Sequence, residues 1–132
     1  MTQRVLVIED DDGARDALGY LLAEEGYAVR TAGSGISGLD CARDFRPDVI
    51  LCDFYLPDID GLQVLRRLRA AGGEAFIIVV TAGCRGGVEE RALRAEADLF
   101  FDKPVDLGRL RHALHAVQPR GPEPGGAPRA IN

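Results

Sequence analysis

Short runs of apolar residues, rich in β-branched side chains, alternate along the chain with segments of helical periodicity. Such runs suit parallel strands that are covered on both faces, because neither face then needs polar side chains. The alternation therefore predicts an α/β domain, in which right-handed crossovers place helices on both faces of a doubly wound sheet. The expected strands are Val5–Ile8, Ala28–Thr31, Val49–Cys52, Phe76–Thr81 and Ala97–Phe101.

Between these runs, apolar residues recur at helical spacing, and we expect them to face the core. Two further helices are expected, at about 35–45, which carries two glycines, and at about 88–95, which has a thin apolar face. The clearest stripes are Ala14, Ala17, Leu18, Leu21 and Leu22, then Leu62, Leu65 and Leu68, and finally Leu107, Leu110, Leu114 and Val117.

The length of 132 residues predicts one folded domain, which we place at residues 1–118. Residues 119–132 contain four prolines and three glycines, so we expect a flexible tail or linker there. The net charge of -5 makes direct binding to nucleic acid an unfavourable function for the domain. The chain has no apolar run long enough to span a membrane and no signal-peptide pattern, so the expected compartment is the cytoplasm.

The three cysteines do not have the spacing of a disulfide framework or a zinc site. We expect Cys41 and Cys52 to be free, buried thiols, whereas Cys84 falls in a loop near the candidate site. His112 and His115 are three residues apart on the last helix, but no further metal ligand accompanies them. They are expected to be surface residues.

Charged and polar residues gather where the predicted strands end. Glu9 and Asp10 follow the first strand, Asp53 follows the third, Thr81 ends the fourth, and Lys103 follows the fifth. The carboxyl ends of parallel strands meet at one edge of a sheet, which is where ligand sites occur in such folds. We therefore expect these side chains to converge.

Carboxylates at such an edge favour Mg²⁺, which prefers oxygen ligands and commonly binds beside a phosphate. Without a cation the carboxylates repel one another, so the site should be electrostatically strained. A carboxylate can also act as a nucleophile toward phosphorus, provided that the developing charge is neutralised. Lys103 and the cation could neutralise that charge, and the Thr81 hydroxyl could donate a hydrogen bond to a phosphoryl oxygen.

Over about residues 3–118 the chain resembles the receiver domains of two-component response regulators. The resemblance rests on residues 5–10, on Asp53 followed by residues 56–61, on Thr81 with Ala82, and on residues 100–104. It implies a flavodoxin-like, five-stranded parallel sheet of order 2-1-3-4-5 with five helices. It also implies Asp53 as phosphoacceptor and a Mg²⁺ site formed by Asp53, by Asp10 directly, by Glu9 through water and by the backbone carbonyl of Tyr55.

The same resemblance implies that Thr81 and Lys103 sense the phosphoryl group and that Phe100 is the switch residue. In the family an aromatic ring at this position swings inward, which changes the surface of helix four, strand five and helix five. Phe100 has no hydroxyl, where many relatives carry tyrosine, so an output contact that needs a phenolic hydrogen bond is not expected.

The phosphodonor implied by the resemblance is a histidine kinase or a histidine phosphotransfer protein. The implied output partner is an effector protein, a fused output domain or a second copy bound through the same surface. Such a domain is not an enzyme beyond phosphorylating and dephosphorylating itself. Two features depart from the family pattern: a glycine-rich segment at 83–87, which we expect to be mobile, and Glu96 where glycine is common.

Other acidic residues have simpler explanations than metal binding. Asp11 and Asp12 are expected to open the first helix, and Asp58 and Asp60 to form a turn in which Asp60 caps the third helix. Two other functions share the architecture: a phosphohydrolase of the haloacid dehalogenase type and a flavin-binding module. The first normally has an acid two residues after its nucleophile, where this chain has Tyr55, and the second needs a phosphate-binding loop after the first strand.

Overall fold

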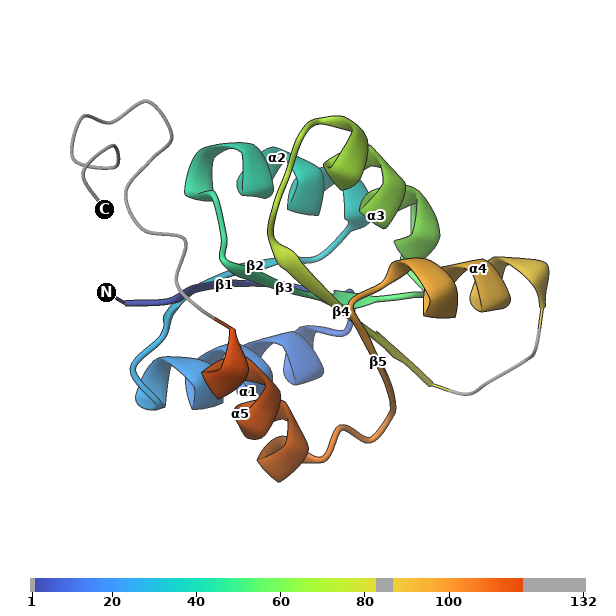
Figure 1. The fold of residues 1–132 in the computed structure, drawn as a ribbon. Coiled ribbons are helices and arrows are strands. Elements are labelled where there is room, and N and C mark those ends of the chain that lie inside the picture. Colours follow the sequence, from blue (N-terminus) through green and yellow to red (C-terminus); the bar gives the residue numbers. More distant parts are fainter. Residues whose placement is uncertain (1, 83–86, 118–132) are drawn as a thin grey trace.

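The strands form one parallel sheet in the order β2-β1-β3-β4-β5 (Figure 1). The computed structural model describes residues 2–82 and 87–117. All four pairs of neighbouring strands run parallel, which confirms the predicted flavodoxin-like, doubly wound fold. The strands are β1 (Arg4–Ile8), β2 (Ala28–Ala32), β3 (Val49–Asp53), β4 (Phe76–Thr81) and β5 (Leu99–Asp102).

In the described residues, helices cover both faces of this sheet (Figure 1). On one face lie α1 (Asp12–Glu24) and α5 (Leu107–Ala116), and on the other lie α2 (Gly35–Phe45), α3 (Gly61–Ala70) and α4 (Val88–Glu96). None of the helices described by the structure is long and apolar enough to cross a membrane.

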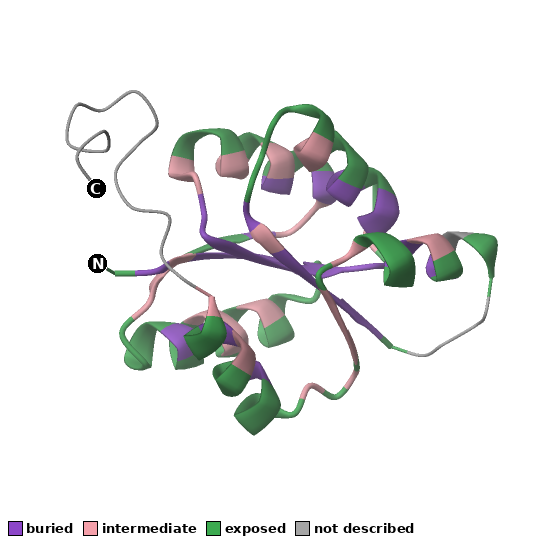
Figure 2. Cartoon of the chain, in the orientation of Figure 1, coloured by how far each residue is buried: buried purple, intermediate pink, exposed green. Residues whose placement is uncertain are grey.

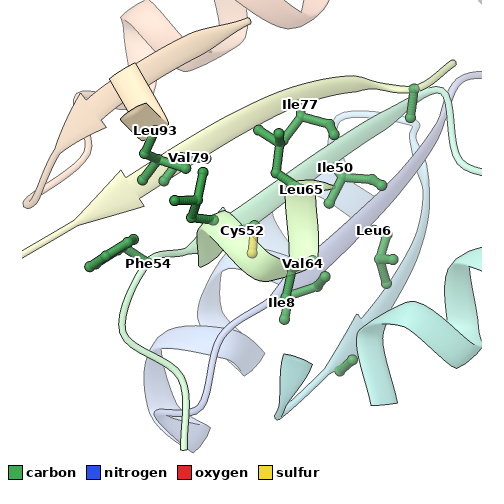
Figure 3. Close-up of a cluster of buried hydrophobic side chains, with 13 residues drawn as sticks. Leu6, Ile8, Ile50, Cys52, Phe54, Val64, Leu65, Ile77, Val79 and Leu93 are labelled. Atoms are coloured by element: carbon green, nitrogen blue, oxygen red, sulfur yellow. The ribbon is translucent and has the colours of Figure 1, made fainter. Parts of the chain in front are cut away.

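The core consists of two apolar layers, one on each face of the sheet. Successive residues of a strand point to opposite faces, so Leu6 and Ile8 join the layer under α2 and α3, while Val5 and Val7 join the layer under α1 and α5. Burial is concentrated on β1, β3 and β4, the three central strands (Figure 2). Figure 3 shows the first layer, in which each fully buried aliphatic side chain stabilises the fold by about 1.5–3 kcal/mol.

Helix α2 lies close against β1 because of one of its two glycines. A Cβ atom on Gly38 would lie 2.5 Å from the side chain of Ile8, so a larger residue would push the helix away from the strand. Ser34 opens the helix with a capping box: its hydroxyl accepts from the backbone N–H of Ser37, and the hydroxyl of Ser37 accepts from that of Ser34. The glycines that weakened the sequence pattern thus serve packing.

Helix α1 is less buried than its apolar stripe predicts. Leu22 is buried and Leu18 half-buried, but Ala14 and Ala17 are exposed, and Leu21 is 43% exposed. The expectation that the whole stripe faces the core was wrong. Leu21 stays partly open because it lines the groove between α1 and α5, which share one face of the sheet.

The same groove explains an error on α5. Leu110 and Leu114 are buried as predicted, but Leu107 lies at the start of the helix and is 45% exposed. It lines the groove between the two helices together with Leu21. Helical spacing thus identified the correct face of α5 but overestimated its burial at the first turn.

The fifth strand begins later than the sequence predicts. Ala97 does not start the strand; its N–H donates to the carbonyl of Leu93 and completes the end of α4. The strand proper runs from Leu99 to Asp102, and α4 extends one residue beyond the expected end.

Candidate phosphoryl and metal site

The chemically useful residues lie together at the carboxyl ends of the strands, the end of the sheet opposite the N-terminus of the chain (Figure 1). Glu9 follows β1, Asp53 ends β3, Thr81 ends β4 and Lys103 follows β5. Asp53 lies opposite Val80 in the ladder, so Thr81 is the next residue on the neighbouring strand. The N–H of Lys103 donates to the carbonyl of Thr81 over 2.7 Å, which places the lysine beside both.

An acidic cluster forms the centre of this site. Glu9, Asp10 and Asp53 each offer a carboxylate oxygen, and these oxygens lie within 4.8 Å of one another. Glu9 and Asp53 are buried, whereas Asp10 is exposed at the rim. This arrangement fits a hard cation, because it supplies only oxygen ligands and leaves one side open for water or a phosphate.

Lys103 bridges the two buried carboxylates. Its Nζ lies 2.6 Å from Oε1 of Glu9 and 3.0 Å from Oδ2 of Asp53. The peptide bond between Lys103 and Pro104 is cis. One ammonium group thus balances part of the negative charge of the cluster and also lies against the carboxylate that would carry a phosphoryl group.

The protonation equilibria show that Asp53 is the more strained of the two acids. Burial raises the pKa of Asp53, the hydrogen bond from Lys103 opposes this rise, and the charge of Glu9 adds to it. Burial also disfavours the ionised form of Glu9, but hydrogen bonds from Lys103 and from the N–H of Asp11 outweigh it, so the pKa of Glu9 falls. The pKa of Lys103 is raised, because its two carboxylate partners outweigh its own burial.

Thr81 contributes a hydroxyl that has no partner. The residue is 1% exposed, and within the described part of the chain its Oγ1 atom makes no hydrogen bond. Buried polar groups are normally satisfied, so an orphaned hydroxyl at a strand end indicates a place for a ligand oxygen. The free hydroxyl of Thr81 and the ammonium group of Lys103 are hydrogen-bond donors, and together they fit a bound oxyanion.

The loop after β3 holds Asp53 from the other side. The N–H of Tyr55 donates to Oδ1 of Asp53 over 3.3 Å, and the N–H of Gly61 donates to the carbonyl of Phe54 over 2.7 Å. A Cβ atom on Gly61 would lie 2.9 Å from Cα of Phe54, so only glycine lets α3 start this close to the strand end. Asp60 caps α3 by accepting from the N–H of Gln63, as predicted.

Asp58 has a role that the sequence did not reveal. Its carboxylate accepts hydrogen bonds of 2.8 Å from the N–H groups of Gly35 and Ile36, and another from Ile59. These bonds, that of Ile36 foremost, lower the pKa of Asp58 to about 2. Asp58 therefore ties the loop beside the site to the first turn of α2, a partnership across 22 residues that no local spacing signals.

Arg15 is a second residue that the sequence did not single out. Its Nη1 donates to the carbonyl of Glu9 over 3.0 Å, and its Nη2 pairs with Asp12 in the first turn of α1. It thereby fixes the backbone of the acidic loop after β1. Asp11 caps α1 by accepting from the N–H of Ala14, and Asp12 lies in the first turn, both as expected.

The candidate switch residue lies half-buried on β5. The guanidinium of Arg94 stacks 4.0 Å from the centre of the Phe100 ring and lies 3.8 Å from Asp102. Glu96, which replaces a common glycine, forms a two-pronged ion pair with Arg66 that ties α4 to α3. The segment 83–86, with Cys84 and the expected mobility, lies outside the described residues.

In the described part of the chain, no thiol or imidazole joins the acidic cluster. Cys41 and Cys52 are free thiols as expected, but Cys41 is half-buried, so the expectation that it is buried was wrong. Complete burial raises the pKa of Cys52 well above its usual value. His112 and His115 are exposed on α5, as expected. In the described residues, a grouping of three potential metal ligands occurs only at Glu9, Asp10 and Asp53.

Comparison with known proteins agrees with this geometry. A family model described as the response regulator receiver domain matches residues 5–115. The chain is 38% identical over 130 residues to response regulator MprA of Mycobacterium sp. (strain KMS), covering 93% of this chain and 56% of the relative. It is 39% identical over 119 residues to response regulator MprA of Mycobacterium tuberculosis (strain ATCC 25618 / H37Rv), covering 89% and 51%. The chain thus spans about half the length of these curated relatives.

Solved structures show the same fold. The N-terminal domain of a protein from Wolinella succinogenes matches with a TM-score of 0.79 and 32% identity, over 86% of this chain and 92% of that one. A CheY-like receiver domain from Methanospirillum hungatei JF-1 matches with a TM-score of 0.79 and 27% identity, over 87% and 92%. These matches favour neither a haloacid dehalogenase nor a flavin-binding module. The chain belongs to the response regulator receiver domain family of two-component signalling systems.

Proposed function

We propose that the chain is a phosphorylation-dependent switch in the cytoplasm whose phosphoacceptor is Asp53. Receiver domains are signalling proteins, and one observation supports this particular assignment above the others. Asp53 is a buried carboxylate with a raised pKa, held 3.0 Å from Lys103 and next to the unpartnered hydroxyl of Thr81. A carboxylate in such surroundings is energetically costly, which is expected of a reacting group rather than a structural one.

Glu9, Asp10 and Asp53, with the backbone carbonyl of Tyr55, would hold Mg²⁺, and Glu9 would act through a bound water. When bound there, the cation neutralises charge on phosphoryl oxygens. The chain supplies the rest. Lys103 lies against an oxygen of Asp53 and can follow the negative charge as it moves to the phosphoryl group.

In the proposed transfer, a carboxylate oxygen of Asp53 attacks the phosphorus of a phosphohistidine. The new O–P bond forms as the P–N bond breaks, and the released imidazole nitrogen takes up a proton. The Thr81 hydroxyl donates to a phosphoryl oxygen and thereby gains the hydrogen bond that it lacks. Later attack by water on the acyl phosphate restores Asp53, so the chain catalyses only its own phosphorylation and dephosphorylation.

The signal would leave the site through Thr81 and Phe100. When Thr81 moves toward the phosphoryl group, it vacates space that the half-buried Phe100 ring can enter, which would release the stacking of Arg94 on that ring. The surface formed by α4, β5 and α5 would change as a result. That surface is the proposed contact for an effector protein, a fused output domain or a second copy of the chain.

The proposed phosphodonor is a histidine kinase or a histidine phosphotransfer protein. Because the curated relatives are about twice as long as this chain, we propose that residues 1–118 form the receiver and that residues 119–132 lead toward whatever follows in such proteins. Neither nucleic acid nor membrane is a proposed partner of the receiver itself.

Phosphorylation with a small donor tests the assignment. Acetyl phosphate with Mg²⁺ should add one phosphoryl group to the chain, measured by intact mass, and EDTA should abolish the gain. Asp53→Ala should abolish it as well, while the matched control Asp44→Ala, an exposed acid on α2, should label like wild type. Persistent labelling of Asp53→Ala would sink the assignment of Asp53.

A further inference from the structure

A cavity lies between α2 and α3, toward the amino ends of the strands and thus away from Asp53. Its volume is about 560 Å³, which falls within the roughly 300–1,000 Å³ that is usual for small-molecule sites. The two helices run side by side over the same face of the sheet (Figure 1). None of the residues assigned to the phosphoryl site lines this cavity, so any ligand there would be a separate one.

Apolar side chains form part of the cavity wall. Ile36 and Leu39 from α2 and Leu68 from α3 line the cavity, and Ile36 is 42% exposed. At one end the turn at Gly72 and Gly73 contributes no side chain, and a Cβ atom on Gly72 would meet no other atom within 4 Å. The cavity therefore offers an apolar body of a ligand both contact surface and an entrance.

The charged residues that line the cavity are mainly basic. Arg43, Arg46, Arg67 and Arg69 contribute to its lining, against one carboxylate, that of Asp40. The whole chain carries a net charge of -5, so this positive patch runs against the overall composition. Guanidinium groups bind phosphate and carboxylate in two-pronged geometry and also stack on planar rings.

At least two of these arginines are available to a ligand. Arg69 is structural, since it bonds to the carbonyl of Ala75 and pairs with Asp98. Among the described residues, Arg43 pairs with the exposed Asp40 over 3.3 Å, a contact of the weak, solvent-screened kind. Within the part of the chain that the structure describes, the guanidinium of Arg67 makes no hydrogen bond or ion pair.

We propose that this cavity, which we call the α2/α3 site, binds a small organic phosphate of the nucleotide class. Arg43 and Arg67 would bind the phosphate from opposite walls, and the base or another planar body would lie against Ile36, Leu39 and Leu68. The volume favours a small molecule over a macromolecular partner, and the combination of apolar side chains with the exposed arginines Arg43 and Arg67 favours an anion that carries an apolar part.

Titration of the chain with ADP in EDTA tests this site, because the acidic cluster at Asp53 cannot recruit ADP without a cation. We expect saturable binding by calorimetry, with amide chemical shifts that move on α2 and α3. Arg67→Ala should weaken binding about tenfold, and Arg43→Ala with Arg67→Ala more than that, because charge-assisted hydrogen bonds are lost. Two fragments of the ligand should each bind at least about tenfold more weakly than ADP. Adenosine lacks the phosphates, and inorganic phosphate lacks the apolar body.

Arg111→Ala is the matched control, since it removes a similarly exposed arginine from α5 and should leave ADP binding unchanged. Ile36→Glu provides a second variant that tests the wall rather than the arginines, and it should also weaken binding. Absence of saturable binding at millimolar ADP would overturn the proposal, as would affinity unchanged in the double arginine variant. Equal affinity for inorganic phosphate and ADP would overturn the proposed ligand class. Phosphorylation of Asp53 by acetyl phosphate should proceed in all these variants, so the two proposals fail separately.

Discussion

The two ends of the sheet differ in how well their buried polar groups are satisfied by hydrogen bonds. At the amino ends of the strands, buried polar groups are satisfied: Asp48 is 2% exposed and accepts from the N–H of Arg4 over 2.7 Å. At the carboxyl ends, Asp53 has a raised pKa and Thr81 has an orphaned hydroxyl. Both ends thus bury an acid beside β3, but the backbone donor is 2.7 Å away at Asp48 and 3.3 Å away at Asp53, which depends more on the ammonium group of Lys103.

At the amino end, hydrogen bonds from charged side chains and backbone groups hold neighbouring segments together. The N–H of Asp48 donates to the carbonyl of Arg4, and Nε of Arg4 donates to the carbonyl of Arg46. Asp98 similarly accepts from the N–H of Ile77 and from Arg69, each over 2.7 Å. The difference teaches that the acids at the amino end have short backbone donors, whereas Asp53 and Thr81 keep strain that a ligand would relieve.

The largest effect is expected at the amino end. Asp48→Ala would leave the buried N–H of Arg4 without its acceptor, which costs about 1–3 kcal/mol. For a domain of this size that corresponds to a loss of roughly 4–12 °C in Tm, measured by circular dichroism. Asp44→Ala, on the exposed side of α2, is the control and should melt like wild type. If Asp48→Ala also melted like wild type, the contrast between the two ends would fail.

The opposite sign is expected at the carboxyl end. Asp53→Asn in EDTA should raise Tm at pH 7 by about 4 °C if it removes roughly 1 kcal/mol of strain. The folded pKa of Asp53 lies above its unfolded value, so the cost of its charge is present at neutral pH and disappears as pH falls through the folded pKa. The gain in Tm should therefore shrink on acidification.

Asp10→Asn gives a graded comparison at the same end. It should raise Tm in EDTA by less than Asp53→Asn, because Asp10 is exposed, and it should weaken Mg²⁺ binding. A lower Tm in both variants would show that these acids stabilise the fold, so that the two ends of the sheet would not differ in this respect.

Asp58 sharpens the comparison, because it lies near the site but is satisfied. Asp58→Asn should lower Tm by a few degrees at pH 7, since the carboxylate holds the first turn of α2. Its pKa is lowered to about 2, so its contribution is present above the unfolded value near 3.8 and is lost as pH falls through 2. Melting curves of both proteins should therefore converge in acid, and a difference that persists at pH 2 would contradict a charge-based role.

The smallest effect is expected at the exposed pair between Arg66 and Glu96. Both side chains are in contact with water, so removing either should change Tm by less than about 2 °C despite the two-pronged geometry. A double-mutant cycle with Arg66→Gln and Glu96→Gln, followed by thermal melting, measures the coupling. Strong coupling would show that satisfied contacts on the surface matter as much as the buried ones at the amino end.

Much of the site could be predicted because its residues end strands. Parallel strands bring their carboxyl ends together whatever the loops do, so Glu9, Asp53 and Thr81 could be placed at one edge from the alternation alone. The strand boundaries were also close, apart from the start of β5, where Ala97 completes α4. The alternation of strands and helices, with the positions of these residues at strand ends, was sufficient to predict the site, because a parallel sheet allows few arrangements of its strand ends.

The rest depends on contacts that sequence spacing does not encode. The local pattern predicts a turn role for Asp58, yet its carboxylate also binds the N-terminus of α2, and no motif signals that Arg15 fixes the backbone of Glu9. The apolar stripe on α1 predicts core residues, but Leu21 lines a groove and is partly exposed. Helical periodicity indicates which side of a helix faces the sheet, but not how deeply each side chain is buried. Such details follow from how helices share a face of the sheet.

Gly61 limits how this site could be grafted onto another protein. The acidic residues alone could be grafted onto the strand ends of another parallel sheet, yet the acceptor would lack its hydrogen bond from the N–H of Tyr55 unless the loop came with it. That loop closes only because α3 starts on a residue without a side chain, since a Cβ atom there would lie 3.0 Å from the carbonyl oxygen of Asp53. The smallest portable unit is therefore the whole segment 53–61, and the glycine that ends it belongs to the graft as much as the aspartate that begins it.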